Sequence, residues 1–311
     1  MRITGLPGVE SARNPATLAQ MASIQVPIDG GTRIVGIIGD PVEHSRSPAM
    51  HNAAFRSLGI PWAYIPFPVY GRNVGAAVRG IRALGIAGIN VTIPHKEAVL
   101  RHLDELTETA RACRAVNTII NRRGTLVGDN TDAPGLTRDW SEIGLSDRVD
   151  LGVVLGAGGA ARAAAVALSK RARRIVIAAR RSPRARALAR DMSRISHVPV
   201  TGVQLSELAP DHPASADHLG GAAIVINATS VGMNGEEFFP LDIGATPRDC
   251  RFYDLIYTAN RTPFLALAAA SRRPVFNGLG MLLHQGALAF EEWTGQPAPL
   301  DVMRRALRAR K

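Results

Sequence analysis

A lysine and an aspartate, 36 positions apart in this 311-residue chain, have the side-chain types needed for proton transfer. Lys96 closes the motif N-V-T-I-P-H-K after a predicted buried strand, and Asp132 closes G-D-N-T-D before a predicted helix. A carboxylate beside an ammonium group can fix its position and steer a proton. Two simpler interpretations stay open, because most lysines are solvated surface charges and aspartate is a common helix N-cap.

Two hydroxyl groups, Ser45 and Ser47, precede a helix that the sequence predicts from Pro48 to about Leu58. Proline suits the first helical position, which makes Ser47 the expected N-cap and leaves Ser45 without a role in the cap. Two hydroxyls beside a helix N-terminus could also hold a small carboxylate together. Both interpretations of Ser47 stay open.

A glycine-rich turn follows a short apolar run, Val153 to Leu155, and leads into an alanine-rich helical pattern. Gly156 allows a sharp turn, and Gly158 and Gly159 remove side chains where a phosphate must approach the backbone. A glycine turn between strand and helix also occurs for packing reasons alone, but its position here favours a dinucleotide site.

The tip of the next predicted strand, about 20 residues further on, is where a dinucleotide fold reads the ribose. The tip runs from Ala179 to Arg184 and contains Arg180 and Arg181, but no carboxylate for a 2′-hydroxyl. Arginines can form charge-assisted hydrogen bonds to a 2′-phosphate, so we expect NADP rather than NAD.

The predicted elements place these groups at the ends of strands. Expected strands alternate with helices along the whole chain, which indicates an α/β protein with parallel sheets. One helix is expected from Glu97 to Ala112, followed by a strand from Ala115 to Asn121. Beyond the glycine turn, Thr229 and Leu255 follow two further predicted strands, so they could border the dinucleotide.

The net charge of +11 is concentrated in two segments. Lys170 to Arg190 contains nine basic residues and no acid, and Arg304 to Lys311 contains five. Without these 14 residues, the 37 basic residues fall to 23, against 26 acidic ones. The excess is therefore local, and we expect neither a nucleic-acid partner nor a membrane partner.

Two cysteines, Cys113 and Cys250, show no metal-ligand spacing and are too few for a disulfide scaffold. This cysteine usage fits a reducing cytoplasm, so we expect a cytoplasmic location. No histidine cluster and no membrane-length apolar segment is evident, so we expect no metal site and no membrane span. His284, on a predicted C-terminal helix, is not assigned a catalytic role.

Several of these motifs occur together in the order seen in shikimate dehydrogenases, and the chain resembles that family from about Ile34 to Trp293. The motifs are H-S-R-S-P, N-V-T-I-P-H-K, A-V-N-T, G-D-N-T-D, G-A-G-G-A-A, N-A-T-S, T-P-F-L and G-L-G-M-L-L-H-Q.

The resemblance implies a role for each matching position. It makes Lys96 and Asp132 the catalytic pair, and it implies that Ser45 and Ser47 bind the substrate carboxylate. The implied lining of the substrate pocket comprises Thr92, Asn117, Tyr257 and Gln285. The implied cofactor residues are Gly156, Ala157, Gly158, Gly159, Ala160, Ala179, Arg180, Arg181, Arg184, Glu108, Thr229, Leu255 and Gly278. Ala179 and Arg181 stand where the family usually has asparagine and threonine.

The expected architecture is an N-terminal α/β substrate domain and a C-terminal doubly wound (Rossmann) NADP domain with a cleft between them. We expect an extension over residues 1–31, the catalytic domain over 32–133, the NADP domain with a linking helix over 134–277, and returning helices over 278–311. The implied reaction is the reversible reduction of 3-dehydroshikimate by NADPH, by a monomer or homodimer. A quinate or related polyol-acid dehydrogenase, and a non-catalytic NADP-binding regulatory module, are the alternatives.

Overall fold

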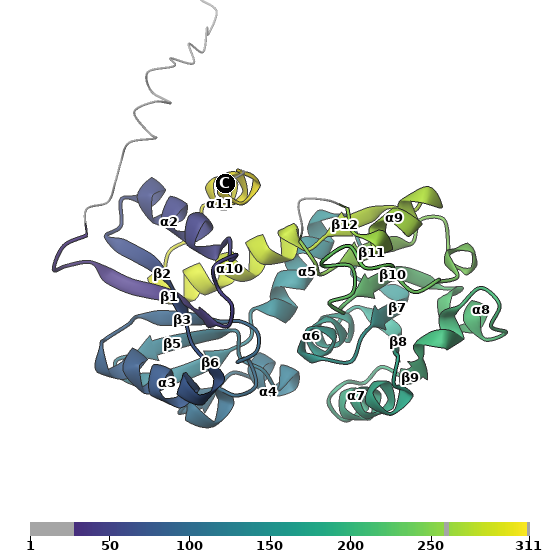
Figure 1. Cartoon of the computed structure of the whole chain (residues 1–311), viewed down its shortest axis with the longest axis horizontal. Helices are drawn as coiled ribbons and strands as arrows, with labels where there is room; N and C mark the ends of the chain where they lie inside the picture. The colour runs from purple at the N-terminus through teal and green to yellow at the C-terminus, as the bar shows by residue number, and fades with distance from the viewer. Residues whose placement is uncertain (1–27, 258–260, 310–311) are drawn as a thin grey trace, which may run out of the picture.

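The protein is described by a computed structural model that covers residues 28–257 and 261–309. Most of the expected N-terminal extension over residues 1–31 therefore lies outside the described residues, and so do the last two residues of the basic C-terminus. Two six-stranded sheets lie on either side of a central pair of helices (Figure 1).

The first sheet has the strand order β2-β1-β3-β5-β6-β4 and mixes parallel and antiparallel pairs. β1 runs parallel to β2 and β3, whereas β5 runs antiparallel to β3 and β6. The strands are β1 (Arg33–Gly39), β2 (Trp62–Pro68), β3 (Gly88–Val91), β4 (Glu105–Leu106), β5 (Thr118–Arg122) and β6 (Thr125–Asp129), and the helices of this half are α2 (Ser47–Leu58), α3 (Val74–Ala83) and α4 (Glu108–Cys113).

The second sheet is entirely parallel and has the order β12-β11-β10-β7-β8-β9. Its strands are β7 (Val149–Leu155), β8 (Ala172–Ala179), β9 (Val200–Gln204), β10 (Ala222–Asn227), β11 (Arg251–Asp254) and β12 (Val275–Asn277), with helices α6 (Gly159–Leu168), α7 (Ser182–Ile195), α8 (Ser215–Leu219) and α9 (Pro263–Ala270). The chain leaves β7 in one direction and returns to its other side at β10, which is the doubly wound topology. Ligands of such sheets bind at the carboxyl ends of these two strands.

Three further helices complete the fold: α5 (Asp132–Glu142), α10 (Leu279–Thr294) and α11 (Leu300–Arg308). α5 and α10 pack against each other between the two sheets (Figure 1). A Cβ on Gly135 would lie 2.8 Å from the backbone nitrogen of Gln285, so glycine permits this close approach. α11 packs against α2, as expected for helices that return to the first half of the molecule.

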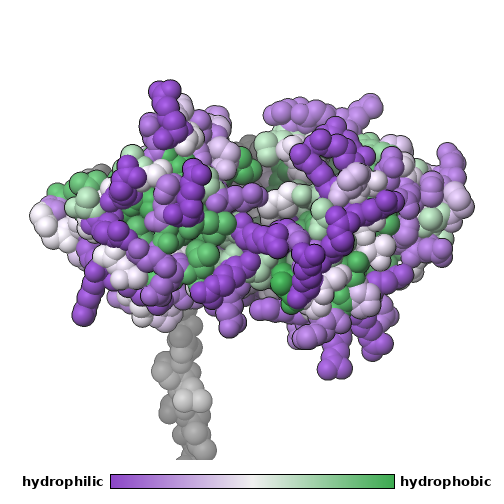
Figure 2. Space-filling model, turned by 90° about the horizontal axis from the view of Figure 1, so that it is seen from below, coloured by the Kyte–Doolittle hydropathy of each residue, from purple (hydrophilic) through white to green (hydrophobic). Residues whose placement is uncertain are grey.

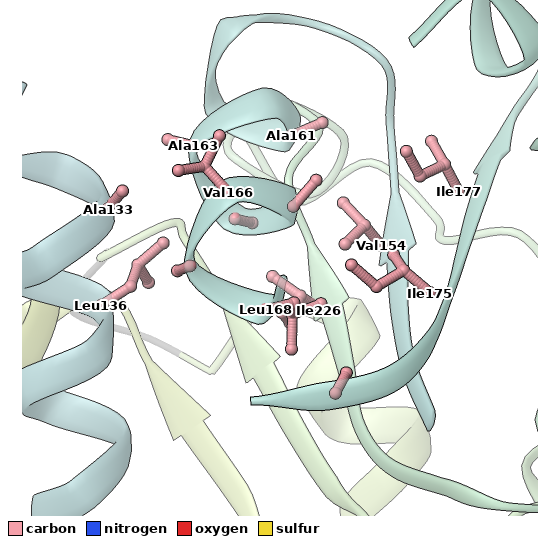
Figure 3. Packing of buried hydrophobic residues seen from close by; sticks show 14 of the residues in the cluster. Ala133, Leu136, Val154, Ala161, Ala163, Val166, Leu168, Ile175, Ile177 and Ile226 are labelled. Carbon is pink, nitrogen blue, oxygen red and sulfur yellow. The ribbon is translucent and has the colours of Figure 1, made fainter. Parts of the chain in front are cut away.

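The alanine-rich helix α6 is buried because it lies between the second sheet and α5 (Figure 3). Leu136 of α5 faces α6, while Val154 of β7 and Ile175 of β8 meet its other side. Small side chains on α6 let these elements approach closely, and Leu136 and Val154 are fully buried. This packing fixes the glycine turn relative to the start of α5.

The expected helix from Glu97 to Ala112 is wrong. The segment instead contains a turn, a short 3₁₀ helix over Leu100–His102, the strand β4 and then α4. β4 pairs with β6, and the carboxylate of Asp104 accepts a hydrogen bond from the Leu126 backbone at 2.7 Å. Tertiary pairing thus overrides the local helical pattern, as helix propensity is only a weak preference.

The strand β6 was not predicted, and β5 begins at Thr118 rather than Ala115. β5 and β6 form an antiparallel hairpin around Arg123 and Gly124, whose φ angles are 53° and 95°. Positive φ at both central positions is the geometry of tight hairpin turns, and glycine supplies it readily. Arg-Gly between two apolar runs was the available sequence signal.

Candidate active site

Lys96 and Asp132 are in direct contact, as the sequence interpretation requires. The Lys96 Nζ atom lies 2.7 Å from Asp132 Oδ2. The Asp132 side chain is only 8% exposed, whereas Lys96 is 29% exposed. The ammonium group is therefore held by a nearly buried carboxylate and still accessible from one side.

Asn117, immediately before β5, fixes the second oxygen of this carboxylate. Its Nδ2 atom donates to Asp132 Oδ1 at 2.9 Å and to Gln285 Oε1 at 3.3 Å. Its Oδ1 atom accepts the backbone N–H of Thr131 at 2.7 Å. A buried amide with both ends engaged in this way orients the acceptor of the lysine. Lys96, Asn117, Asp132 and Gln285 thus form one connected polar cluster.

Asp132 is not the N-cap of α5. The helix begins at Asp132 itself, and no side chain of its preceding residue caps it. Asn130 meets this need instead, because its Oδ1 atom accepts the backbone N–H groups of Asp132 at 3.1 Å and Ala133 at 3.3 Å. The carboxylate of Asp132 is thereby left for Lys96.

The predicted N-cap role of Ser47 is also wrong. Ser47 is the first residue of α2, and the capping position belongs to Arg46 without a side-chain cap. Ser45, which was not expected to take part in the cap, accepts the Ser47 backbone N–H at 3.3 Å through its hydroxyl. Ser47 is buried at the first position of α2, with 4% of its surface exposed.

Two residues behind the serines had no predicted role. Tyr64 donates its hydroxyl to Asn90 Oδ1 at 2.8 Å, and Asn90 in turn donates to the carbonyl of Asn117 at 3.2 Å. This chain of hydrogen bonds connects Tyr64 with the catalytic cluster. Asn90 opens the N-V-T-I-P-H-K motif, which was the one sequence signal for it; Tyr64 had none.

Tyr257 and Thr92 lie at the ends of strands, as predicted. Burial raises the pKa of Tyr257, and the nearby positive charges of Lys96 and Arg46 oppose that rise. Tyr257 therefore lies close enough to Lys96 to feel its charge. Thr92 follows β3, and its Cγ2 methyl group lies 2.3 Å from the position that a Cβ on Gly39 would take.

The loop of Lys96 also approaches the glycine turn of the second half. A Cβ placed on Gly159 would lie 3.9 Å from Glu97 Oε1, and one on Gly158 would meet nothing within 4 Å. Gly156 has a φ of 118°, which side chains rarely tolerate. Ala157 and Ala160 flank these glycines, and α6 starts at Gly159, so its first backbone N–H groups have no partner within the helix.

The arginine-rich tip lies after β8, in line with the glycine turn after β7. Arg180, Arg181 and Arg184 are exposed, and none forms an ion pair with an acidic side chain in the described residues. Ala179 ends β8. These guanidinium groups are free to bind an anion.

The remaining predicted cofactor positions fall into two groups. Thr229 lies beside Gly156, since a Cβ on that glycine would be 3.2 Å from Thr229 Cγ2. Leu255 and Gly278 adjoin each other, since a Cβ on Gly278 would be 2.4 Å from the Leu255 carbonyl oxygen. Glu108 is exposed at the start of α4, which packs against α6.

A third cluster of polar groups lies further along α5. Within the described ranges, Asp139, Glu142 and His284 have ligand-type atoms within 4.8 Å of one another. Their atoms already have partners, because His284 and Arg304 bind Glu142 at 2.9 Å and 2.6 Å and the Tyr253 hydroxyl donates to Asp139. This arrangement connects α5, α10, α11 and β11.

A doubly wound sheet with a glycine turn and an arginine tip, together with a lysine–aspartate pair at the edge of the first half, defines a two-domain nicotinamide-dependent dehydrogenase. Comparison with known proteins agrees. The family described as "Shikimate dehydrogenase substrate binding domain" matches residues 37–119, and "Shikimate 5'-dehydrogenase C-terminal domain" matches residues 278–308.

Individual relatives cover most of the chain. The shikimate dehydrogenase (NADP(+)) of Symbiobacterium thermophilum is 45% identical over 89% of this chain and 94% of its own. A crystal structure of a shikimate dehydrogenase in complex with NADP⁺ has a TM-score of 0.81, 38% identity and coverage of 90% and 96%. Quinate dehydrogenase from Corynebacterium glutamicum, in complex with NAD, has a TM-score of 0.79, 29% identity and coverage of 88% and 98%.

This chain belongs to the shikimate dehydrogenase family. The predicted α/β fold class and the predicted family are thereby confirmed. Among the helices that the structure describes, none has the length and apolar character to cross a membrane.

Proposed function

We propose that this protein catalyses the reversible reduction of 3-dehydroshikimate by NADPH, giving shikimate and NADP⁺, as in the route to chorismate and the aromatic amino acids. The observation that carries this proposal is the 2.7 Å contact between Lys96 and Asp132, on a loop that faces the glycine turn. The substrate follows from the relatives at about 45% identity that are named shikimate dehydrogenase (NADP(+)).

Lys96 acts on the carbonyl oxygen of the substrate. Its ammonium group stabilises the negative charge that develops there during reduction and delivers a proton. Asp132 orients the ammonium group, and Asn117 orients Asp132. Because the amide hydrogen bond leaves one carboxylate oxygen for lysine, the geometry exists before substrate arrives.

The residues around the substrate would fix the face of the ring that meets Lys96. Ser45 and Ser47 grip its carboxylate at the start of α2, while Thr92, Asn117, Tyr257 and Gln285 bind ring hydroxyls. Ser47 is suited to this task since it is the first residue of α2 and not its N-cap, so its hydroxyl is not used in a helix cap.

The second half of the site fits NADP. The space in front of Gly158 and Gly159 receives the pyrophosphate, with Ala157 and Ala160 beside it. Arg180, Arg181 and Arg184 hold the 2′-phosphate, and Ala179 borders the adenosine. Bound NADPH supplies the hydride, which no side chain can. The positions that complete the cofactor site are Glu108, Thr229, Leu255 and Gly278.

The substitution Lys96→Ala tests the assignment directly. We expect kcat to fall by roughly 10² or more with little change in the KM for shikimate, as for loss of a general acid. Circular dichroism checks the fold of the variant. A large rise in KM at unchanged kcat would make Lys96 a binding residue and contradict the proposal.

A quinate dehydrogenase is the second candidate, because the quinate enzyme of Corynebacterium glutamicum shares this fold. Its structure holds NAD, whereas the arginine tip of this chain favours NADP. Comparing kcat/KM for shikimate and quinate, each with NADP⁺ and NAD⁺, separates the two candidates. Tight NADPH binding without turnover of any cyclohexene acid would instead indicate a regulatory module.

The arginine tip provides a separate test of cofactor choice. We expect Arg180→Ser and Arg184→Ser to raise the KM for NADP⁺ by about tenfold each, since each removes a charge-assisted hydrogen bond to phosphate. The KM for NAD⁺ should stay nearly constant, because NAD lacks that phosphate. An equal rise for both cofactors would place these arginines elsewhere than at the 2′-phosphate.

We also propose a cytoplasmic location and a monomeric or dimeric state. Cys113 and Cys250 are buried free thiols, and burial raises the pKa of each to about 12, so they stay protonated and inert. Light scattering on a size-exclusion column determines the oligomeric state.

A further inference from the structure

A hollow of ≈ 630 Å³ lies at the opposite end of α5 and α10 from the catalytic pair. Its lining residues come from α11 on one side and from β12 and α9 of the second half on the other. Figure 1 shows where these elements lie. Asp132 begins α5, whereas Asp139 and Glu142 of the same helix line the hollow. Seven to ten residues of helix separate the two sites by about 10–15 Å. The hollow is therefore distinct from the active site.

The walls of the hollow combine apolar and polar side chains. This volume falls within the range of about 300–1,000 Å³ that small-molecule sites occupy, and such sites are mostly apolar with a few polar groups. Side chains from three separate elements contribute. The apolar residues that a ligand ring or chain would contact are Ile256, Leu265, Val275, Phe276, Leu279 and Leu283.

The polar groups of the hollow carry a surplus of positive charge. Arg261, Arg304 and Arg308 line it, together with the carboxyl groups of Asp139 and Glu142. Glu142 is neutralised by Arg304, whose Nη2 atom lies 2.6 Å from Glu142 Oε1. Asp139 accepts a hydrogen bond from the Tyr253 hydroxyl, and burial raises its pKa. In the described residues Arg261 and Arg308 pair with neither carboxylate, so these two guanidinium groups remain for an incoming anion.

Arg261 and Arg308 are exposed at the rim, and in the described residues neither has a carboxylate partner. The helix that carries Arg308 is held in place, because Arg46 Nη1 donates to the Leu307 carbonyl at 3.0 Å. The rim is thus formed without a ligand.

We propose that this hollow is a second binding site, for a small organic anion that combines a carboxylate with an apolar ring. The carboxylate binds Arg261 and Arg308 through charge-assisted hydrogen bonds, and the ring packs against Phe276 and Leu283. No residue assigned to catalysis or to the cofactor lines the hollow, but Ile256 and Leu279 of its lining adjoin the assigned residues Leu255, Tyr257 and Gly278 in the chain.

Isothermal titration with trans-cinnamate tests this site. The titration is done on the full-length protein, with and without NADPH plus shikimate, two compounds that fill the active site and cannot react with each other. We expect one cinnamate per chain, with the same affinity in both conditions. Absence of saturable binding at millimolar cinnamate, or its displacement by NADPH plus shikimate, would overturn the proposal.

Variants at the rim locate the bound anion. We expect Arg261→Gln and Arg308→Gln each to weaken cinnamate binding by about tenfold, because each loses one charge-assisted hydrogen bond. Arg305→Gln is the matched control, since Arg305 is exposed on the same helix but does not line the hollow. It should bind cinnamate like the wild type. An equal loss in all three variants would reduce the effect to general electrostatic attraction and contradict a defined site.

Discussion

The two ends of α5 hold two buried aspartates that have different hydrogen-bond partners. Asp132 and Asp139 are seven residues apart, two helical turns, and are 6% and 4% exposed. Asp132 contacts the ammonium group of Lys96, whereas Asp139 accepts a hydrogen bond from the neutral phenol of Tyr253. Only Asp132 lies beside a charged group that can act on a substrate. An aspartate side chain therefore serves proton transfer at one end of α5 and packing between helices at the other.

The surroundings of the helix reflect the same division. At its first turn, α5 meets loops of the first sheet that carry polar side chains. At its last turn it meets α10, α11 and β11. The difference between the two ends teaches that the partner of a buried carboxylate, and not its burial, decides its chemical use.

Hydrophilic side chains cover much of the face seen in Figure 2, with apolar residues in patches between them.

Replacing the charged aspartate should have the largest effect. Asp132→Asn keeps the shape of the side chain and one oxygen for Asn117, but it removes the negative charge that holds Lys96. We expect kcat to fall by about 10²-fold at neutral pH, as when a positioned acid–base group is lost. Steady-state kinetics in the direction of shikimate oxidation measure this change. Activity close to wild type would show that Lys96 needs no carboxylate partner.

Glycine replacements at the two ends of the α5–α10 contact should have intermediate effects. A Cβ added at Gly135 would lie 2.8 Å from the Gln285 backbone nitrogen. One added at Gly280 would lie 2.0 Å from Asp139 Oδ1. We expect Gly135→Ala and Gly280→Ala each to lower the free energy of unfolding by about 1–3 kcal/mol. The KM for shikimate should rise in Gly135→Ala alone, because only that variant displaces Gln285.

Urea unfolding and steady-state kinetics measure these two quantities for both glycine variants. A similar change of KM in both variants would show that the two ends of the contact are coupled, and would contradict the division between them.

Asp139→Asn should have the smallest effect on activity, with kcat within about threefold of wild type. Burial raises the pKa of Asp139 above the unfolded value of about 3.9. Between the unfolded pKa and the raised native pKa, the native state binds more protons than the unfolded state. Wild-type stability therefore falls as the pH rises through this range. Asparagine does not titrate, so the variant should gain stability relative to wild type from about pH 4 upward. Urea unfolding across this pH range measures the difference, and parallel stability profiles would contradict the raised pKa.

The sequence alone determined much of the molecule, because its strongest signals are local. The glycine turn after β7, the arginine tip after β8 and the helix that starts near Asp132 depend on neighbouring residues, and so each could be placed from the chain. The order of motifs gave the family.

Only the tertiary structure decided which groups meet. Whether Asp132 caps a helix or holds Lys96 depends on Asn130, which takes the backbone N–H groups, and on Asn117, which arrives from another strand. The failure of the predicted helix after Lys96 has the same origin, since pairing of β4 with β6 joins segments more than 20 residues apart. Long-range hydrogen bonds of this kind leave no periodic trace in the sequence, because their donors and acceptors become neighbours only when the chain has folded.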